Sequence, residues 1–300
     1  MDRTGCIVAP TDFSPAAERA TRRAASLASA LDRPLYLMHV IPPQDLLEKL
    51  FPGPAVTGAE ALRSQAERAL RERAQRIAEQ FGLTPECKVV SGEAHRAILD
   101  TSDSLQTDLI VLGAQGEREG VLPTETVGDT ALKLAERSLK ATLLVRREAQ
   151  EHYCHVVACA KGVPADRAVV GWANKVSPSD LIHIVSAYAV PLERRLREWG
   201  ASQTTLDTYA TRERDERARR LSGLLSEFGV PAARARLHME RGEPLPTILR
   251  MAAEWQADLL VVGRRAQANP LSAGQFASIA RHIVFRASMD VMIVPPSGPP

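Results

Sequence analysis

The sequence predicts an α/β protein made of two tandem copies of one domain, each an open, five-stranded parallel sheet with helices on both faces. Short apolar runs, such as residues 109–112 and 259–262, indicate strands buried on both faces of a parallel sheet. Between these runs lie stretches whose apolar residues recur at helical spacing, and such alternation gives a sheet covered by helices. The whole pattern then occurs a second time within the 300 residues.

Residues of the same type recur in the two halves of the chain at a nearly constant offset. At an offset of 150 positions the matched pairs are Gly92 and Gly242, Asp108 and Asp258, and Gly113 and Gly263. The offset falls to 147 for Phe81-Gly82 and Phe228-Gly229, and to 144 for His39 and His183. This drift predicts a shorter first helix in the second half. We therefore expect domains at residues 1–148 and 153–296, joined by a polar stretch.

Each element of the first half has its own signal. Strands are predicted where apolar residues predominate, at 6–9, 35–40, 87–90, 109–112 and 142–145. Helices are predicted from Pro15 onward and over 62–81, 94–101 and 127–138. The first helix begins at Ser14-Pro15, because serine caps a helix and proline suits its first position. The helix at 62–81 has an outer face rich in arginine and glutamate, which is expected to be solvated.

The remaining stretches follow the same logic. Residues 41–58 contain four prolines and two glycines and are predicted to form a loop. The second half repeats the first, with strands at 156–160, 181–185, 259–262 and 292–294 and a long helix at 204–228.

One connection in the first half has the features of a ligand site. A strand ends at Gly113, and a loop with Gly116, Gly120 and Gly128 leads into a helix. Such a loop can hold phosphate, because free backbone N–H groups and the helix dipole face it. Glycines in α/β turns also occur for backbone geometry alone. Asp12 follows the first strand, at the edge where open α/β sheets bind ligands, although a turn or capping role fits it equally well.

The composition limits the classes of function. The chain has 38 basic and 36 acidic residues, a net charge of +2, which gives no electrostatic footprint for nucleic acid. Its apolar runs are too short for a signal peptide or for a membrane span of roughly 20 residues, so we expect a cytoplasmic protein. The four cysteines lie mostly in apolar runs and are expected to be buried free thiols of a reducing compartment.

Other kinds of site find little support. His152, Cys154, His155 and Cys159 crowd one stretch, but Cys154 and His155 would point to opposite faces of a strand, so no metal site is expected. The sequence contains neither a Gly-x-Ser-x-Gly nor a Cys-x-x-Cys motif. Neither serine hydrolysis nor dithiol redox chemistry is therefore expected.

Three segments of the first half together point to one known family. They are the opening Val-Ala-Pro-Thr-Asp-Phe-Ser at 8–14, then His39-Val40, and then Gly113-x-x-Gly116 with its spacer, Gly128, helix and strand. These segments resemble the first strand, the end of the second strand and the ATP loop of the universal stress protein family in its tandem form. The resemblance implies an adenine nucleotide alpha hydrolase-like fold in both halves and a non-enzymatic regulator of the stress response.

The resemblance also implies an ATP site, with Mg²⁺, in the first half. Asp12 would face the adenosine part, and Val40 would line the adenine pocket. The loop glycines would admit the ribose and phosphates, and Thr130 would offer a hydroxyl group. The residues implied as cofactor-binding are Pro10, Thr11, Asp12, Val40, Leu112, Gly113, Gly116, Gly128, Asp129 and Thr130.

The first-half loop departs from the family's ATP pattern, in which nine residues follow Gly-x-x-Gly before a glycine and then serine or threonine. Here the spacer at 117–127 has eleven residues, and Asp129 follows Gly128. The loop contains one cationic residue, Arg118, and four carboxylates: Glu117, Glu119, Glu125 and Asp129. A Mg²⁺ ion could offset this charge by bridging oxygens. Thr130 could supply the missing hydroxyl, so ATP binding and a ligand-free domain both stay open.

The second half departs further, so any nucleotide is expected in the first half, near Asp12 and Gly113. Lys161 stands in the second half where Asp12 stands in the first. Gly263 is followed by Arg264-Arg265-Ala266, and Ala277-Ser278 replaces Gly128-Asp129. A bulky residue at Gly113 is expected to abolish binding and leave the fold intact.

Three functions remain open at this point: a regulator that senses adenine nucleotide, a slow ATPase or nucleotide-transfer enzyme, and a ligand-free protein-interaction module. An enzyme would need a cation at the phosphates and a positioned base, and the first-half loop offers only Arg118.

We expect an intrachain pseudo-dimer in which the strands at 143–145 and 292–294 pair, because an exposed apolar edge invites aggregation. A homodimer and an unidentified protein partner are further expectations, whereas nucleic acid and membrane are not.

Overall fold

The computed structural model describes residues 5–43, 55–115, 127–148, 152–188, 193–264 and 279–296. The chain forms two compact units. The first joins residues 1–152 with 284–292, and the second joins 153–283 with 293–300. The domain boundaries at 1–148 and 153–296 follow the sequence repeat and stay a prediction.

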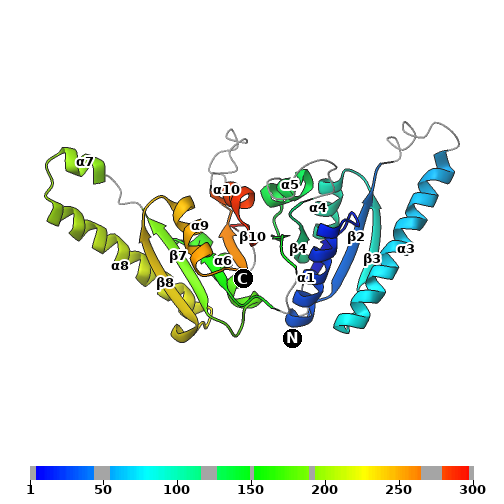
Figure 1. Cartoon of the computed structure of the whole chain (residues 1–300), viewed down its shortest axis with the longest axis horizontal. Helices are drawn as coiled ribbons and strands as arrows, with labels where there is room; N and C mark the ends of the chain where they lie inside the picture. The colour runs from blue at the N-terminus through cyan, green and yellow to red at the C-terminus, as the bar shows by residue number, and fades with distance from the viewer. Residues whose placement is uncertain are drawn as a thin grey trace. The chain divides into compact units, whose positions relative to one another are not determined.

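The first half alternates strands and helices in the predicted order (Figure 1). Its strands are β1 (Cys6–Pro10), β2 (Leu35–Ile41), β3 (Glu86–Ser91), β4 (Thr107–Gly113) and β5 (Ala141–Val145). Its helices are α1 (Pro15–Leu31), α3 (Ala55–Phe81), α4 (Ala94–Ser104) and α5 (Asp129–Arg137). The strands form a parallel sheet in the order β3-β2-β1-β4-β5. β1 and β5 are buried at every residue, as their apolar runs predict.

The helices of the first half pack on the sheet in two groups. α1 packs on β1 and β4 and contacts α3, whereas α4 packs on β2 and β4 and contacts α5. α1 begins as predicted, because the Ser14 hydroxyl accepts a hydrogen bond from the Ala17 N–H at 3.2 Å and Pro15 is its first residue. Small residues let α1 approach the sheet closely, and Ala16, Ala17, Ala20 and Ala24 are buried there.

The strand order creates a switch point between β1 and β4. From β1 the chain proceeds to β2 and β3 on one side, and it then returns to β4 on the other side of β1. Connections that leave neighbouring strands in opposite directions open a crevice at the carboxyl ends of those strands, where open α/β sheets bind ligands. Asp12, just after β1, and Gly113, at the end of β4, both lie at this edge.

The second half repeats the architecture of the first. Its strands are β6 (Val156–Cys159), β7 (Ile182–Tyr188), β8 (Ala235–Arg241), β9 (Leu259–Gly263) and β10 (Asp290–Val294). Its helices are α6 (Arg167–Val176), α7 (Glu193–Glu198), α8 (Gln203–Glu227), α9 (Pro244–Glu254) and α10 (Ile279–Arg286). The parallel order β9-β6-β7-β8 matches β4-β1-β2-β3. The predicted fold of two tandem α/β copies is confirmed, as is the shorter first helix, with 10 residues in α6 against 17 in α1.

The structure corrects several details of the sequence analysis. The predicted loop at 41–58 is too long, because β2 runs to Ile41 and α3 begins at Ala55. A short additional helix, α7, precedes α8. All four cysteines are thiols, but Cys87 is exposed because β3 forms an edge of the sheet, and only Cys6 is buried. Across the described ranges, no helix offers an apolar stretch of the length that a bilayer requires.

Candidate functional site

A cavity of about 280 Å³ lies at the switch point of the first sheet. Nine of the ten residues predicted to bind a nucleotide line it: Pro10, Thr11, Asp12, Val40, Leu112, Gly113, Gly128, Asp129 and Thr130. The tenth, Gly116, lies outside the described residues, as do Glu117, Arg118, Glu119, Gly120 and Glu125. The fold thus brings the described candidates together in one cavity, and their binding of a ligand stays a prediction.

Thr11 holds the turn that follows β1. Its N–H donates to the Met38 carbonyl at 2.8 Å, and its hydroxyl oxygen accepts from the Phe13 N–H at 3.0 Å. Its carbonyl lies 2.7 Å from Nδ1 of His39. Because a carbonyl can only accept, Nδ1 of His39 must carry the hydrogen of this bond. The turn is therefore anchored to β2 through both backbone and side chain.

Phe13 bends the chain directly after Asp12. Its φ of 66° is in the left-handed region, which a bulky residue seldom adopts. Its ring contacts the His39 ring, at 4.5 Å between ring centroids, and the Arg73 guanidinium, at 5.3 Å from the Phe13 centroid. Oδ1 of Asp12 accepts a hydrogen bond from the Ser14 N–H at 3.0 Å. These contacts fix the Asp12 carboxylate at the cavity wall.

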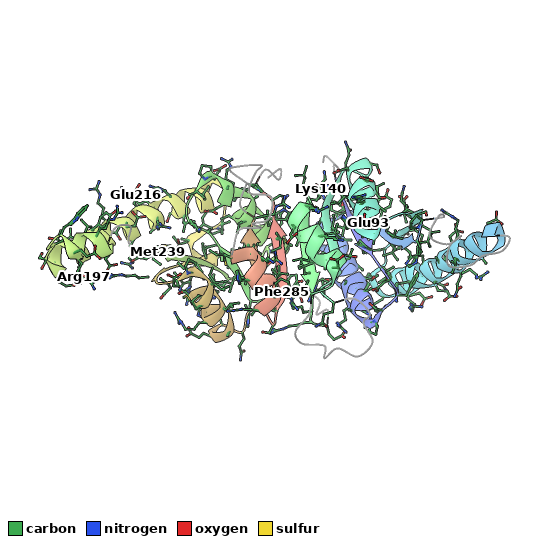
Figure 2. All side chains as sticks on the ribbon, turned by 90° about the horizontal axis from the view of Figure 1, so that it is seen from above. Glu93, Lys140, Arg197, Glu216, Met239 and Phe285 are labelled. Atoms are coloured by element: carbon green, nitrogen blue, oxygen red, sulfur yellow. The ribbon has the colours of Figure 1, made fainter. Side chains whose placement is uncertain are left out.

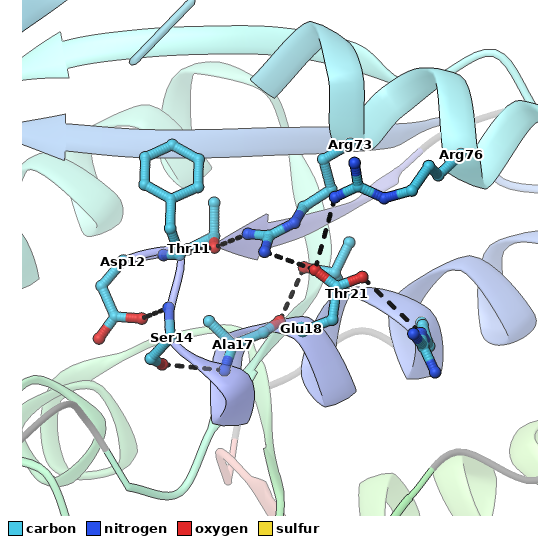
Figure 3. A network of polar contacts seen from close by, with 10 residues as sticks. Thr11, Asp12, Ser14, Ala17, Glu18, Thr21, Arg73 and Arg76 are labelled. Atoms are coloured by element: carbon cyan, nitrogen blue, oxygen red, sulfur yellow. Dashed lines mark hydrogen bonds and ion pairs between the residues drawn. The ribbon is translucent and has the colours of Figure 1, made fainter. Parts of the chain in front are cut away.

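Arg73 of α3 ties this turn to α1 (Figure 3). Its Nη1 donates to the Thr11 hydroxyl at 2.6 Å, and its Nη2 lies 2.5 Å from Oε2 of Glu18. The side chain of Arg73 is only 8% exposed, so the prediction of a solvated face is wrong at this residue. In Figure 3 the Asp12 carboxylate lies on the opposite side of the turn from Arg73. Glu18, rather than a ligand in the cavity, is the counterion of this arginine.

His39 also lines the cavity, although the sequence analysis did not include it among the predicted binding residues. Its ring is half-buried and is held by the bond to the Thr11 carbonyl. Met38 pairs with Pro10 in the parallel ladder, so His39 of β2 lies beside Thr11, the first residue after β1. The alignment of β1 with β2 is the signal that would have identified this residue.

Gly113 is required by packing, whether or not a ligand binds. A Cβ atom at this position would lie 2.9 Å from the backbone carbon of Ala16 and 3.0 Å from its Cβ. The expectation that a bulky residue at Gly113 would leave the fold intact is therefore wrong, because such a residue would push against the backbone of α1. Substitution of Gly113 is a test of packing and cannot isolate ligand binding.

Gly128 brings the start of α5 to the end of β4. Its N–H donates to the Ala114 carbonyl at 2.9 Å, and it caps the helix. Its φ of −63° and ψ of 144° lie in the extended region that any residue can adopt, so this conformation does not demand glycine. Asp129 and Thr130 follow it and line the cavity.

Equivalent hydrogen bonds identify the counterparts of these residues in the second half. The bond from the Thr11 N–H to the Met38 carbonyl corresponds to the bond from the Ala160 N–H to the Val185 carbonyl. Likewise, the bond from the Gly92 N–H to the Ile41 carbonyl corresponds to the bond from the Gly242 N–H to the Tyr188 carbonyl. By this register Lys161 is the second-half equivalent of Asp12, as the sequence analysis expected. The equivalent of His39 is Ser186, so the match of His39 with His183 is wrong.

The second half keeps the bend after its first strand but changes the groups around it. Gly162, the counterpart of Phe13, has a φ of 77°. The backbone N–H of Lys161 donates to Oδ2 of Asp166 at 2.7 Å. The other predicted departures, Arg265, Ala266, Ala277 and Ser278, lie outside the described residues.

Two histidines and a tryptophan form a cluster in the second unit. Nδ1 of His183 lies 3.1 Å from Nε2 of His238, and the Trp255 ring lies 4.3 Å and 4.2 Å from the two imidazoles between centroids. Burial lowers the pKa of both histidines. Both rings are therefore neutral near pH 7, and one donates to the other. The charged or titratable groups that face the pair are Arg236, His155 and Glu240.

Acid is expected to destabilise the second unit through this pair. Because the folded-state pKa values lie below the ordinary value of 6.5, the unfolded chain takes up protons first as the pH falls. The free energy of unfolding therefore decreases below about pH 6.5 and is unaffected above it. The double variant His183→Gln, His238→Gln should show a smaller difference in urea midpoint between about pH 7.5 and about pH 5.5. The exposed His282→Gln is the control, and an unchanged difference in the double variant would exclude the cluster.

The residues considered as zinc ligands have another role. β6 begins at Val156, so Cys154 and His155 precede the strand, and the strand argument used against a shared ion is wrong. Their N–H groups donate to the Asp258 carboxylate at 2.7 Å and 3.1 Å. Among the described residues, no group of three or more His, Cys, Asp or Glu side chains could hold a metal ion.

Comparison with known proteins gives one consistent result. A sequence model of the universal stress protein family matches residues 5–146 and again residues 152–295. A universal stress protein from Mycolicibacterium smegmatis is 26% identical over 301 residues, which cover 97% of each chain. A crystal structure of a universal stress protein from Archaeoglobus fulgidus aligns with a TM-score of 0.71 and 16% identity, covering 98% of this chain and 99% of the other. A crystal structure of a putative universal stress protein from Pseudomonas aeruginosa aligns with a TM-score of 0.66 and 16% identity, covering 97% of this chain and 92% of the other. The structural likenesses show the fold.

Proposed function

Because the chain belongs to the universal stress protein family, we propose that its first half binds an adenine nucleotide and that the protein acts as a cytoplasmic, non-enzymatic regulator. The observation that carries the proposal is the cavity at the switch point of the first sheet. The carboxyl ends of β1 and β4 and the start of α5 meet there. This is the edge at which open α/β sheets bind nucleotides.

The lining of the cavity suits the nucleoside part of such a ligand. Met38, Val40, Ile98 and Leu112 offer apolar surface to a base, and Asp12 offers a carboxylate to the adenosine part. The volume of about 280 Å³ is close to the lower end of the roughly 300–1,000 Å³ found for small-molecule sites. The start of α5, with Gly128 and Thr130, would face the phosphates, and a Mg²⁺ ion bound with ATP would bridge phosphate oxygens.

The charges around the cavity support binding without turnover. Phosphoryl transfer depends on cations placed at the phosphates and on a group that orients the nucleophile. In the described part of the lining there is neither lysine nor arginine. Arg73, close to the turn after β1, is paired with Glu18. We therefore favour a sensor over a slow ATPase.

Adenine ligands are expected to raise the midpoint of thermal unfolding of the intact chain. A ligand at one hundred times its Kd stabilises the folded state by about 2.7 kcal/mol, which corresponds to a shift of several degrees. The measurement compares adenosine, AMP, ADP and ATP, with and without Mg²⁺, and uses GTP and tripolyphosphate as controls. The absence of a shift with every adenine ligand would contradict the proposal, and steady phosphate release from ATP would favour the enzyme.

A further inference from the structure

A second cavity of the first unit, of about 390 Å³, adjoins the proposed adenine site. Three arginines from three segments line it: Arg19 of α1, Arg146 directly after β5, and Arg286 at the end of α10. We call this cavity the arginine pocket. Gln115 is the one described residue that lines both cavities. The arginine pocket therefore has its own set of charged side chains, which the proposed adenine site does not use.

The lining of the arginine pocket leaves these charges without matching carboxylates. Among the described residues that line it there is neither aspartate nor glutamate. Nη1 of Arg19 lies 3.9 Å from Oε1 of Glu148, a side chain that is 72% exposed, so water screens this attraction. Arg286 is exposed and forms no ion pair with a described residue. The pocket thus carries an excess of positive charge.

Arg146 is held in place by the backbone of the segment opposite. Its Nη2 donates to the Val284 carbonyl, and its backbone N–H donates to Oδ1 of Asp290 at 2.8 Å. Oδ2 of Asp290 also pairs with Nε of Arg23, at 3.7 Å. Burial lowers the pKa of Arg146, and the Asp290 charge opposes this shift. One carboxylate therefore serves two arginines, Arg23 and Arg146, and does not compensate both.

Two of the three guanidinium groups that line the pocket are also short of hydrogen bonds. In the described part of the chain, the Nε atoms of Arg19 and Arg146 are buried and have no partner. A desolvated charge without compensation is costly, and an anion in the pocket would reduce this cost. Guanidinium groups match phosphate oxygens in shape and in charge, so a phosphate group is the favoured anion.

The remaining wall of the pocket is largely apolar. Phe285 of α10, labelled in Figure 2, lines it together with the buried Val145 and Ala287. An apolar wall excludes water from one side of a ligand and so strengthens the attraction between opposite charges. The volume of about 390 Å³ lies within the roughly 300–1,000 Å³ of small-molecule sites, which leaves room for more than one phosphate group.

We propose that the arginine pocket is a second ligand site of the first unit, which binds a free anion of two linked phosphate groups, of the class of pyrophosphate. Arginines on three different segments can then each contact a separate phosphate oxygen. This inference goes beyond the proposed adenine site and does not depend on it, because pyrophosphate carries no base.

The inference is tested by isothermal titration of the intact chain with pyrophosphate, in a buffer free of other phosphate and of sulfate. The unmodified protein should bind one pyrophosphate per chain. The double variant Arg19→Gln, Arg286→Gln should bind it at least about tenfold more weakly, because it loses two charge-assisted contacts. Arg286→Gln alone should weaken binding at least about threefold, and it should leave the fold unchanged because this side chain is exposed.

The matched control is the double variant Arg71→Gln, Arg250→Gln, which removes the same charge outside the pocket. Both arginines are exposed and pair with a glutamate one turn away, at 2.9 Å and 2.7 Å. At about 0.15 M salt their distant charges are screened, so pyrophosphate affinity should stay within about twofold. No binding by the unmodified protein, unchanged affinity in the Arg19 and Arg286 variant, or an equal loss in the control would overturn the inference. Anion binding at the start of α5 instead would give the second of these results.

Discussion

Replacing Asp12 by asparagine is expected to weaken adenosine binding by about tenfold to hundredfold and to change the free energy of unfolding by less than about 0.5 kcal/mol. Asparagine keeps an oxygen that can accept the hydrogen bond from the Ser14 N–H, which is 3.0 Å long, so the turn and the start of α1 should persist. A hydrogen bond to a charged group contributes about 1.5–3 kcal/mol, and about 1.4 kcal/mol corresponds to a factor of ten in affinity.

Adenosine is the right probe for this variant because it carries no charge. With ATP, removal of the Asp12 carboxylate would also remove a repulsion of the phosphates, and the two effects would oppose each other. The control is Lys161→Ala, which changes the counterpart of Asp12 in the second half and should leave adenosine affinity unaltered. Equal losses in the two variants would mean that the ligand is not confined to the first half.

Replacing Gly113 by alanine is expected to destabilise the first unit by about 1–3 kcal/mol, because overpacking forces backbone to shift. The added Cβ would meet the backbone of Ala16 at 2.9 Å, and a helix backbone cannot move aside as a side chain can. Hydrogen exchange of the β4 amides reports the loss of stability of this unit alone. A measurement for one unit is needed because a chain with two domains need not unfold in one step.

The second half provides a matched comparison. At Gly263, the counterpart of Gly113, Cγ2 of Val169 is the one described atom that an added Cβ would meet, at 3.2 Å. A side-chain methyl group can shift by a few tenths of an ångström, so Gly263→Ala should cost less than about 1 kcal/mol. Similar destabilisation by the two substitutions would show that the closeness of α1 to β4 is not the cause.

Local signals in the sequence were sufficient to place most elements. Ser14-Pro15 predicted the start of α1, and the apolar runs predicted strands whose ends lie within about three residues of those observed. The residues around the cavity were predictable because they follow strands, and a parallel sheet brings the ends of its strands to one edge. Asp12 and Gly113 are 101 positions apart in the chain, yet they line the same cavity.

What the sequence did not reveal depends on contacts between distant elements. His183 was matched to His39 by residue type, whereas the hydrogen-bond register of the strands pairs His39 with Ser186. Arg73 is buried because a carboxylate on another helix receives it, and nothing in α3 itself signals this. Cys87 is exposed because the strand order leaves β3 at an edge, which its composition does not indicate.

The two halves make the same left-handed bend after their first strand, with Phe13 at a φ of 66° and Gly162 at 77°. Glycine adopts this conformation without steric cost, whereas another residue meets a cost of roughly 1–2 kcal/mol. In the first half that cost is offset by the contact of the Phe13 ring with His39 and by the hydrogen bond from Arg73 to Thr11, two residues 62 positions apart. During folding, we therefore expect the bend of the second half to form from the local chain alone, and the bend of the first half to become stable only after α3 has docked.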